Sequence, residues 1–118
     1  MSDETKISYS EWKIMELFWT ESMLTIGEIK ERLKDSDWSE STIKTLVRRL
    51  VDKNVIARSG VSGKYIFFPL VTKEECVKSE LDSIINSVFN GSVYNLLNAI
   101  YTGDYLDEAQ KRKFKEMF

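Results

Sequence analysis

The sequence predicts a mainly α-helical protein with one small β-hairpin. Two observations predict this fold class. The 118 residues include only one Pro and five Gly, so few positions interrupt a helix. Apolar residues recur at helical spacing along most of the chain, and β-type runs occur only around residues 55–70. This length suits one compact domain, or one small domain with an appendage.

Two capping signals predict the first two helices. In "SYSE", Ser8 and Glu11 have the spacing of a capping box, and we expect a helix over about residues 10–20. In "TIGE", Thr25 and Glu28 repeat this spacing before a short helix of about three turns. The two helices are therefore close neighbours in the chain.

A third helix is predicted after Ser39, its N-cap, and ends at about residue 53, because Asn54 suits a left-handed stop. One narrow apolar stripe occupies positions i, i+3, i+4, i+7 and i+8, namely Ile43, Leu46, Val47, Leu50 and Val51. The opposite side carries small hydroxyls and cations, with Ser41, Thr45 and Arg48 near its centre and Lys44 and Arg49 on its flanks.

A β-hairpin is predicted next, from "VIARS" and "KYIFFPL", with a tight tip between Gly60 and Gly63. Arg58 lies on the first strand, and Lys64 follows the tip. Two helices, a basic third helix and a hairpin form the order of a winged helix-turn-helix domain. The boundary of this domain is predicted at residue 71.

Residues 72–118 are predicted to form a three-helix dimerisation tail, whose last helix covers "DYLDEAQKRKFKEMF" and begins at about Asp104. A segment of this size cannot bury its apolar stripes alone. It either packs on the first domain or, as we favour, pairs with a second copy. The residues expected at the dimer interface are Leu81, Ile84, Ile85, Val88, Phe89, Val93, Leu96, Leu97, Ile100, Tyr101 and Phe114.

The charge distribution indicates nucleic acid as a partner. The net charge is −2, yet residues 41–70 contain six basic residues and one acidic residue. Exposed Arg can read guanine edges in the major groove, and flanking cations suit phosphates. Trp12, Phe18, Trp19 and Trp38 could stack on bases, but their spacing favours a role in the core.

Other functional classes are disfavoured by composition. The chain has no His and a single cysteine, Cys76, so it offers no Ser-His or Cys-His pair, no disulfide and no His metal site. We therefore expect no enzymatic activity, no metal and no cofactor. No apolar run is long enough to cross a bilayer, and the N-terminus does not resemble a signal peptide, so a cytoplasmic location is predicted.

Three motifs, "ISYSEWKIMELFW", "DWSESTIKTLVRRLVDKNVI" and "GKYIFFPLV", resemble the penicillinase-repressor family over almost the whole chain. This family includes the penicillinase and methicillin-resistance repressors and a copper-responsive branch. The resemblance implies a homodimeric winged-helix repressor that binds double-stranded promoter palindromes with TACA and TGTA half-sites. Together with the helix pattern, it assigns DNA contact to Ser41, Thr42, Lys44, Thr45, Arg48, Arg49, Arg58 and Lys64.

The resemblance also implies a route of inactivation, in which a membrane sensor-protease pathway leads to cleavage of the tail between Asn and Phe. The aligned bond here joins Asn98 to Ala99. The cysteine cluster of the copper branch is missing, and Glu40 replaces the family's usual Pro. The alternative function is a winged-helix protein-interaction module without specific DNA binding, which Glu40 and the acidic flanks favour.

Overall fold

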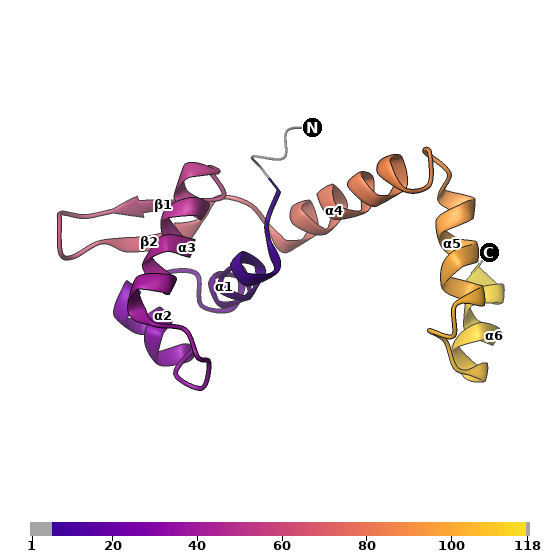
Figure 1. Ribbon diagram of the computed structural model, residues 1–118, viewed down its shortest axis with the longest axis horizontal. Helices are drawn as coiled ribbons and strands as arrows, with labels where there is room; N and C mark the ends of the chain where they lie inside the picture. Colours follow the sequence, from indigo (N-terminus) through magenta and orange to yellow (C-terminus); the bar gives the residue numbers. More distant parts are fainter. Residues whose placement is uncertain (1–5, 118) are drawn as a thin grey trace. The chain divides into compact units, whose positions relative to one another are not determined.

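The computed structural model describes residues 6–117 and shows the chain divided into two compact units, Met1–Cys76 and Val77–Phe118. Within the described residues, the elements are α1 (Tyr9–Glu21), α2 (Ile26–Arg32), α3 (Glu40–Asp52), β1 (Ile56–Ser59), β2 (Ile66–Pro69), α4 (Lys73–Ser87), α5 (Val93–Thr102) and α6 (Glu108–Met117) (Figure 1). The order predicted from the sequence is therefore present. The first five residues, on which part of the localisation prediction depends, lie outside the described residues.

The caps of the first three helices form as predicted. Ser8 and Glu11 make a reciprocal capping box on α1, and Thr25 and Glu28 do the same on α2. Ser39 accepts a hydrogen bond from the backbone N–H of Thr42 at 3.2 Å and so begins α3. After α3 the chain turns at Asn54, whose φ is 61°, the left-handed conformation that ends a helix.

The first unit has one hydrophobic core, which α1, α2, α3 and the hairpin surround. The largest fully buried side chains are Phe18, Ile14, Met15, Leu24, Ile29, Ile43, Leu50, Ile56 and Val47. The three tryptophans are partly buried and pack against this core. Trp12 and Trp19 meet edge to face, with ring centroids 5.3 Å apart. Their expected role in the core is confirmed.

The hairpin joins the core through a strand contact that no sequence pattern predicts. β1 and β2 pair antiparallel, with Arg58 opposite Phe67. Leu24, which lies between α1 and α2, forms a further antiparallel bridge with Phe67 through backbone hydrogen bonds of 3.0 and 2.8 Å. At the tip, Gly60 has a φ of 109°, and a Cβ there would lie 2.6 Å from the carbonyl oxygen of Lys64. Only glycine fits this turn.

The chain after the hairpin stays attached to the first unit up to Cys76, beyond the predicted boundary at residue 71. The indole N–H of Trp19 donates to the carbonyl oxygen of Val71 at 3.0 Å. Lys73 forms an ion pair with Glu16 at 2.9 Å. The side chain of Cys76 lies buried in the core. These contacts place the first turn of α4 with the first unit.

In the second unit, the last helix begins later than predicted. Asp104 has a φ of 63°, which a helix cannot contain, so the predicted start of the helix there is wrong. α6 begins at Glu108 instead. Asp107 caps it by accepting from the N–H of Gln110 at 2.8 Å, while the Gln110 side chain accepts from the N–H of Asp107 at 3.0 Å.

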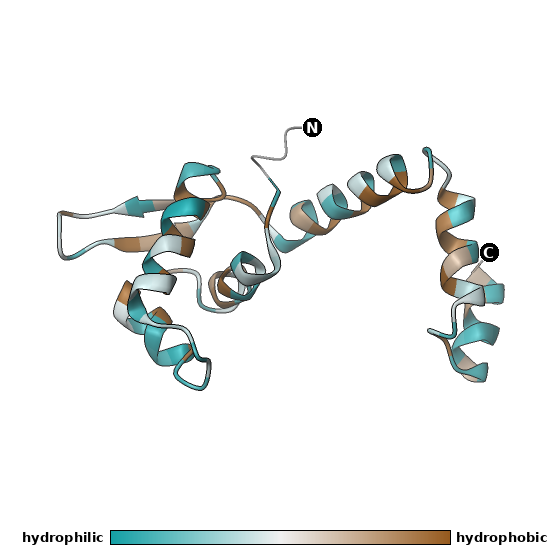
Figure 2. Cartoon of the chain, viewed as in Figure 1, coloured by the Kyte–Doolittle hydropathy of each residue, from teal (hydrophilic) through white to brown (hydrophobic). Residues whose placement is uncertain are grey.

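The second unit buries none of its described residues, 77–117. Apolar segments recur along α4 and α5 (Figure 2), yet Val77, Leu81, Ile84 and Val88 are 39–64% exposed. Within this unit the rings of Tyr101 and Phe114 lie 5.7 Å apart. No helix among the described residues has the length and apolar content that a membrane span requires.

Candidate nucleic-acid interface

Helix α3 has one buried face and one charged face. Ile43, Leu46, Val47 and Leu50 point into the core and are at most 5% exposed. This spacing turns the other side of the helix outward, so that Ser41, Thr42, Lys44, Arg48 and Arg49 are exposed and Thr45 is half-buried. The structure therefore brings the predicted α3 residues to one accessible side of one rigid helix.

The hydroxyl groups on this face are held by local hydrogen bonds. Thr45 donates from Oγ1 to the carbonyl oxygen of Ser41 at 2.9 Å. The Oγ atoms of Ser39 and Ser41 lie 3.2 Å apart, and Oγ1 of Thr42 lies 3.0 Å from Oγ of Ser39. A Thr whose hydroxyl proton is used in this way still offers its methyl group and an acceptor lone pair to a partner.

A buried ion pair fixes the C-terminal end of α3. Nζ of Lys53 donates to both carboxylate oxygens of Glu11, at 2.6 and 2.8 Å, and to the carbonyl oxygen of Lys6 at 2.6 Å. Glu11 is 2% exposed. Burial by itself raises the pKa of Glu11, but the hydrogen bonds from Lys53 and Ser8 outweigh burial and hold this pKa below its ordinary value. The pair therefore ties α3 to the start of α1.

The N-terminal end of α3 carries an exposed ion pair. Nζ of Lys44 lies 3.8 Å from a carboxylate oxygen of Glu40, one turn earlier in the helix. The side chains are 61% and 49% exposed, so solvent weakens their attraction. The carboxylate still competes with any phosphate that approaches Lys44.

The hairpin supplies two further cations. Arg58 and Lys64 are both exposed, and the tip between them projects beyond α1, α2 and α3 (Figure 1). The guanidinium carbon of Arg58 lies 4.4 Å from the centre of the Tyr65 ring. Among the described residues, no carboxylate lies within ion-pair distance of Arg58 or Lys64. Both charges are therefore available to an anionic partner.

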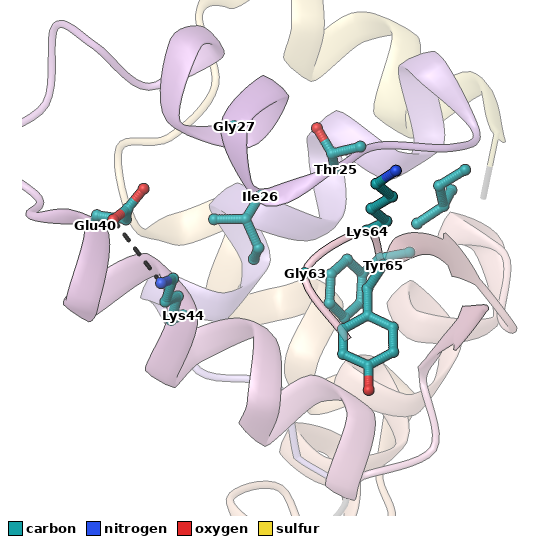
Figure 3. A pocket seen from close by; sticks show the side chains of 10 residues that line it. Thr25, Ile26, Gly27, Glu40, Lys44, Gly63, Lys64 and Tyr65 are labelled. Atoms are coloured by element: carbon teal, nitrogen blue, oxygen red, sulfur yellow. Dashed lines mark ion pairs between the residues drawn. The ribbon is translucent and has the colours of Figure 1, made fainter. Parts of the chain in front are cut away.

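A groove of about 730 Å³ separates the hairpin from α2 and α3 (Figure 3). Lys44 and Glu40 lie on one side of it, and Lys64 lies on the other. Its lining residues are Thr25, Ile26, Gly27, Glu40, Lys44, Gly63, Lys64, Tyr65, Ile66 and Phe67. An apolar floor between two lysines suits a polyanion whose sugar groups contact the floor and whose phosphates contact the lysines.

Several parts of this interface could not be predicted from the sequence because they depend on tertiary contacts. Thr25 was recognised only as a helix cap, and Tyr65 only as a strand residue. Once the register places Arg58 opposite Phe67, Tyr65 becomes the diagonal neighbour of Arg58 on the same face. Within residues 6–117, no group of three or more His, Cys, Asp or Glu side chains could hold a metal ion.

This architecture defines a winged helix-turn-helix DNA-binding protein, because a cationic α3 follows α2 through a short connection and a two-stranded wing follows α3. Residues 7–118 of this chain match the sequence model of one protein family, the penicillinase repressors. The chain belongs to the penicillinase repressor family.

Individual relatives agree with this membership. The chain is 26% identical over 102 residues to the penicillinase repressor of Bacillus licheniformis, covering 86% of this chain and 80% of the relative. It is 29% identical over 93 residues to the methicillin resistance regulatory protein MecI of Staphylococcus aureus, covering 78% of this chain and 76% of the relative. The solution structure of the DNA-binding domain of the repressor BlaI superposes with a TM-score of 0.55 at 26% identity, covering 64% of this chain and 93% of that domain.

The chain is therefore a DNA-binding transcriptional repressor of the BlaI and MecI type, and it is not an enzyme.

Proposed function

We propose that this repressor binds a promoter palindrome as a homodimer and blocks transcription there. The observation that carries the proposal is the alignment of cations along α3, the groove and the wing. Lys44 and Lys64 line opposite sides of one groove, and Arg48 projects from the outer face of α3. The half-sites we propose are of the TACA and TGTA type, by extension from the family.

Each residue of the interface has an expected role. Arg48 reads a base edge, since an exposed Arg on a recognition helix can form two hydrogen bonds with guanine. Ser41, Thr42 and Thr45 allow close approach to the groove floor. Lys44, Arg49, Arg58 and Lys64 contact phosphates, which fix the register of the protein on the duplex.

The exposed apolar residues of the second unit support the homodimer. Covering them requires a second surface of the same character, and a second copy provides one through a two-fold axis. The proposed interface consists of Leu81, Ile84, Ile85, Val88, Phe89, Val93, Leu96, Leu97, Ile100, Tyr101 and Phe114, all exposed or half-buried. Such a dimer presents two copies of α3 to the two half-sites of a palindrome.

Proteolysis between Asn98 and Ala99, downstream of a membrane sensor-protease, is the proposed route of induction. Asn98 lies in α5, where its carbonyl oxygen accepts a hydrogen bond from Oγ1 of Thr102 at 2.8 Å. Its side chain lines a hollow of about 400 Å³ together with Tyr101 and Phe114. Cleavage there removes α6 and the last four of the ten residues of α5 from the dimer surface, and the dimer then dissociates from DNA by mass action. The protein would act in the cytoplasm, together with the chromosome.

Fluorescence anisotropy tests the proposal with a labelled TACA/TGTA palindrome and a scrambled duplex, at low and near-physiological salt. We expect a preference of about a hundredfold or more for the palindrome at the higher salt. Equal and salt-sensitive binding to both duplexes contradicts the proposed half-sites. Absence of binding at both salt concentrations would instead favour a winged-helix protein-interaction module.

Two substitutions distinguish residues that read bases from residues that contact phosphates. Arg48→Ala is expected to cost about 1–3 kcal/mol on the palindrome and little on the scrambled duplex. Lys64→Ala is expected to weaken both duplexes alike and to reduce the slope of log K against log salt by about one. Lys34→Ala is the matched control, because Lys34 pairs with Glu31 and lies outside the groove. Equal loss on both duplexes for Arg48→Ala contradicts its role in reading bases.

A further inference from the structure

The aromatic ring of Tyr65 contacts Arg58, one of the two cations of the wing. Its ring lies under the guanidinium of Arg58, with 4.4 Å between the guanidinium carbon and the ring centre. Arg58 is exposed, whereas Tyr65 is half-buried and lines the groove that also contains Lys44 and Lys64. The Tyr65 ring therefore lines the groove (Figure 3) and also contacts the arginine of the wing.

The ring itself is anchored to the core. Tyr65 and Phe67 meet edge to face, with centroids 6.4 Å apart. Phe67 is 5% exposed, and its backbone forms both hydrogen bonds of the bridge to Leu24. The position of the Tyr65 ring is thus set by the interior of the first unit, although the hairpin tip extends beyond the helices.

An arginine stacked on a ring keeps its hydrogen-bonding edge free. When a guanidinium stacks with its face on a ring, its N–H donors lie in the guanidinium plane and stay free for other partners. No carboxylate among the described residues pairs with Arg58, unlike Lys44, which has Glu40 beside it. The contact with Tyr65 therefore restricts Arg58 before any ligand binds, so binding loses less side-chain entropy.

We propose that Tyr65 is a positioning residue that orders Arg58 for contact with a phosphodiester of the DNA backbone beside the wing. This inference rests on the proposed DNA-binding function and assigns a residue that the sequence analysis did not include. Tyr65 acts through Arg58, by its aromatic face rather than by its hydroxyl group.

The test is a double-mutant cycle on the full chain, read by anisotropy with the TACA/TGTA palindrome and the scrambled duplex. Tyr65→Phe keeps the ring and should bind within about twofold of the original protein. Tyr65→Leu loses the ring and should bind both duplexes about two- to fivefold more weakly. Arg58→Gln should weaken both duplexes and lower the salt slope by about one. In the Arg58→Gln background, Tyr65→Leu should cause no further loss.

Several outcomes overturn the inference. A Tyr65→Leu loss that persists in the Arg58→Gln background means that the ring merely supports the hairpin. A Tyr65→Phe loss equal to that of Tyr65→Leu assigns the effect to the hydroxyl group. Unchanged binding by Tyr65→Leu removes the positioning role, provided that Arg58→Gln still weakens binding. If the original protein binds neither duplex, the proposed function fails and this inference fails with it.

Discussion

The two units of this chain differ in how far they bury their apolar side chains. The first unit buries Phe18, Ile14 and Leu50 almost completely, within a core that lies between its helices and its hairpin. The second unit has helices with equally regular apolar patterns but leaves every described residue from 77 to 117 at least partly exposed. The apolar pattern of a helix therefore predicts which side chains should be buried. Only the tertiary structure shows whether the same chain buries them.

This difference has a consequence for stability. A unit with its own core loses stability on core substitution whatever the protein concentration. A unit that depends on a second copy loses stability in a concentration-dependent way, because association supplies its missing core. Substitutions in the two units can therefore separate the two behaviours.

Phe18→Ala is expected to lower the free energy of unfolding of the first unit by about 3–5 kcal/mol, because a fully buried ring leaves a cavity. Chemical denaturation at two protein concentrations tests this, with the same loss expected at both. Tyr9→Ala is the control, since Tyr9 is 95% exposed and should change stability by less than about 0.5 kcal/mol. A loss below about 1 kcal/mol for Phe18→Ala would contradict a rigid core around this ring.

Leu81→Glu is expected to weaken the proposed dimer about a hundredfold, equivalent to about 2.7 kcal/mol, because its two-fold axis would place two unpaired carboxylates in an apolar interface. Sedimentation equilibrium measures the effect, and the fold of the first unit should not change. Asn86→Glu is the matched control, because it adds the same charge on the opposite side of α4. Equal effects of the two substitutions would place the interface elsewhere.

Lys53→Met is expected to cost about 2 kcal/mol of stability, since it leaves the buried carboxylate of Glu11 without its main partner. The expected pH dependence follows from the lowered pKa of Glu11 in the folded state. The stabilisation is complete above the ordinary pKa of about 4.5 and is lost as the pH falls through the lower folded value. Denaturation between pH 3 and pH 7 should show this acid-dependent loss in the original protein.

In the Lys53→Met variant this acid-dependent loss should be shallower, because the hydrogen bonds that lower the Glu11 pKa are fewer. Lys34→Met provides the control, since Lys34 forms an exposed pair with Glu31 and should leave the pH profile unchanged. An unaltered profile for Lys53→Met would mean that another group controls the acid sensitivity.

Local signals in the sequence predicted the helices, but long-range contacts completed the interface. Capping by Ser8, Thr25 and Ser39 depends on residues three positions away, so it could be predicted. The Lys53–Glu11 pair and the Leu24–Phe67 bridge join distant residues, and no local pattern reveals them. The start of α6 was misplaced because acids throughout residues 104–108 suited a first helical turn equally well.

The same limit applies to the functional site. The exposed side of α3 followed from its apolar stripe, so Lys44 and Arg48 could be assigned from the sequence. The groove between Lys44 and Lys64 depends on how the hairpin packs on α2 and α3, which the sequence does not show. The i,i+4 spacing of Glu40 and Lys44 is visible in the sequence, but the position of this pair in the groove depends on the same packing.

The smallest predicted effect concerns this Glu40–Lys44 pair. Glu40→Gln should strengthen binding to both duplexes about two- to threefold and steepen the salt slope by up to about one, because Lys44 no longer has a competing carboxylate. Glu31→Gln is the control, since Glu31 pairs with Lys34 outside the groove. Anisotropy titrations at several salt concentrations measure both quantities.

A Lys44→Gln background shows how Glu40 acts. If Glu40 weakens binding by occupying Lys44, Glu40→Gln should have no effect once Lys44 is replaced. If the gain persists there, the carboxylate repels phosphate directly and the ion pair is incidental. The two effects can then be compared as measured affinities. Arg58 contacts an aromatic ring, which leaves its charge free, whereas Lys44 contacts a carboxylate, which partly neutralises its charge.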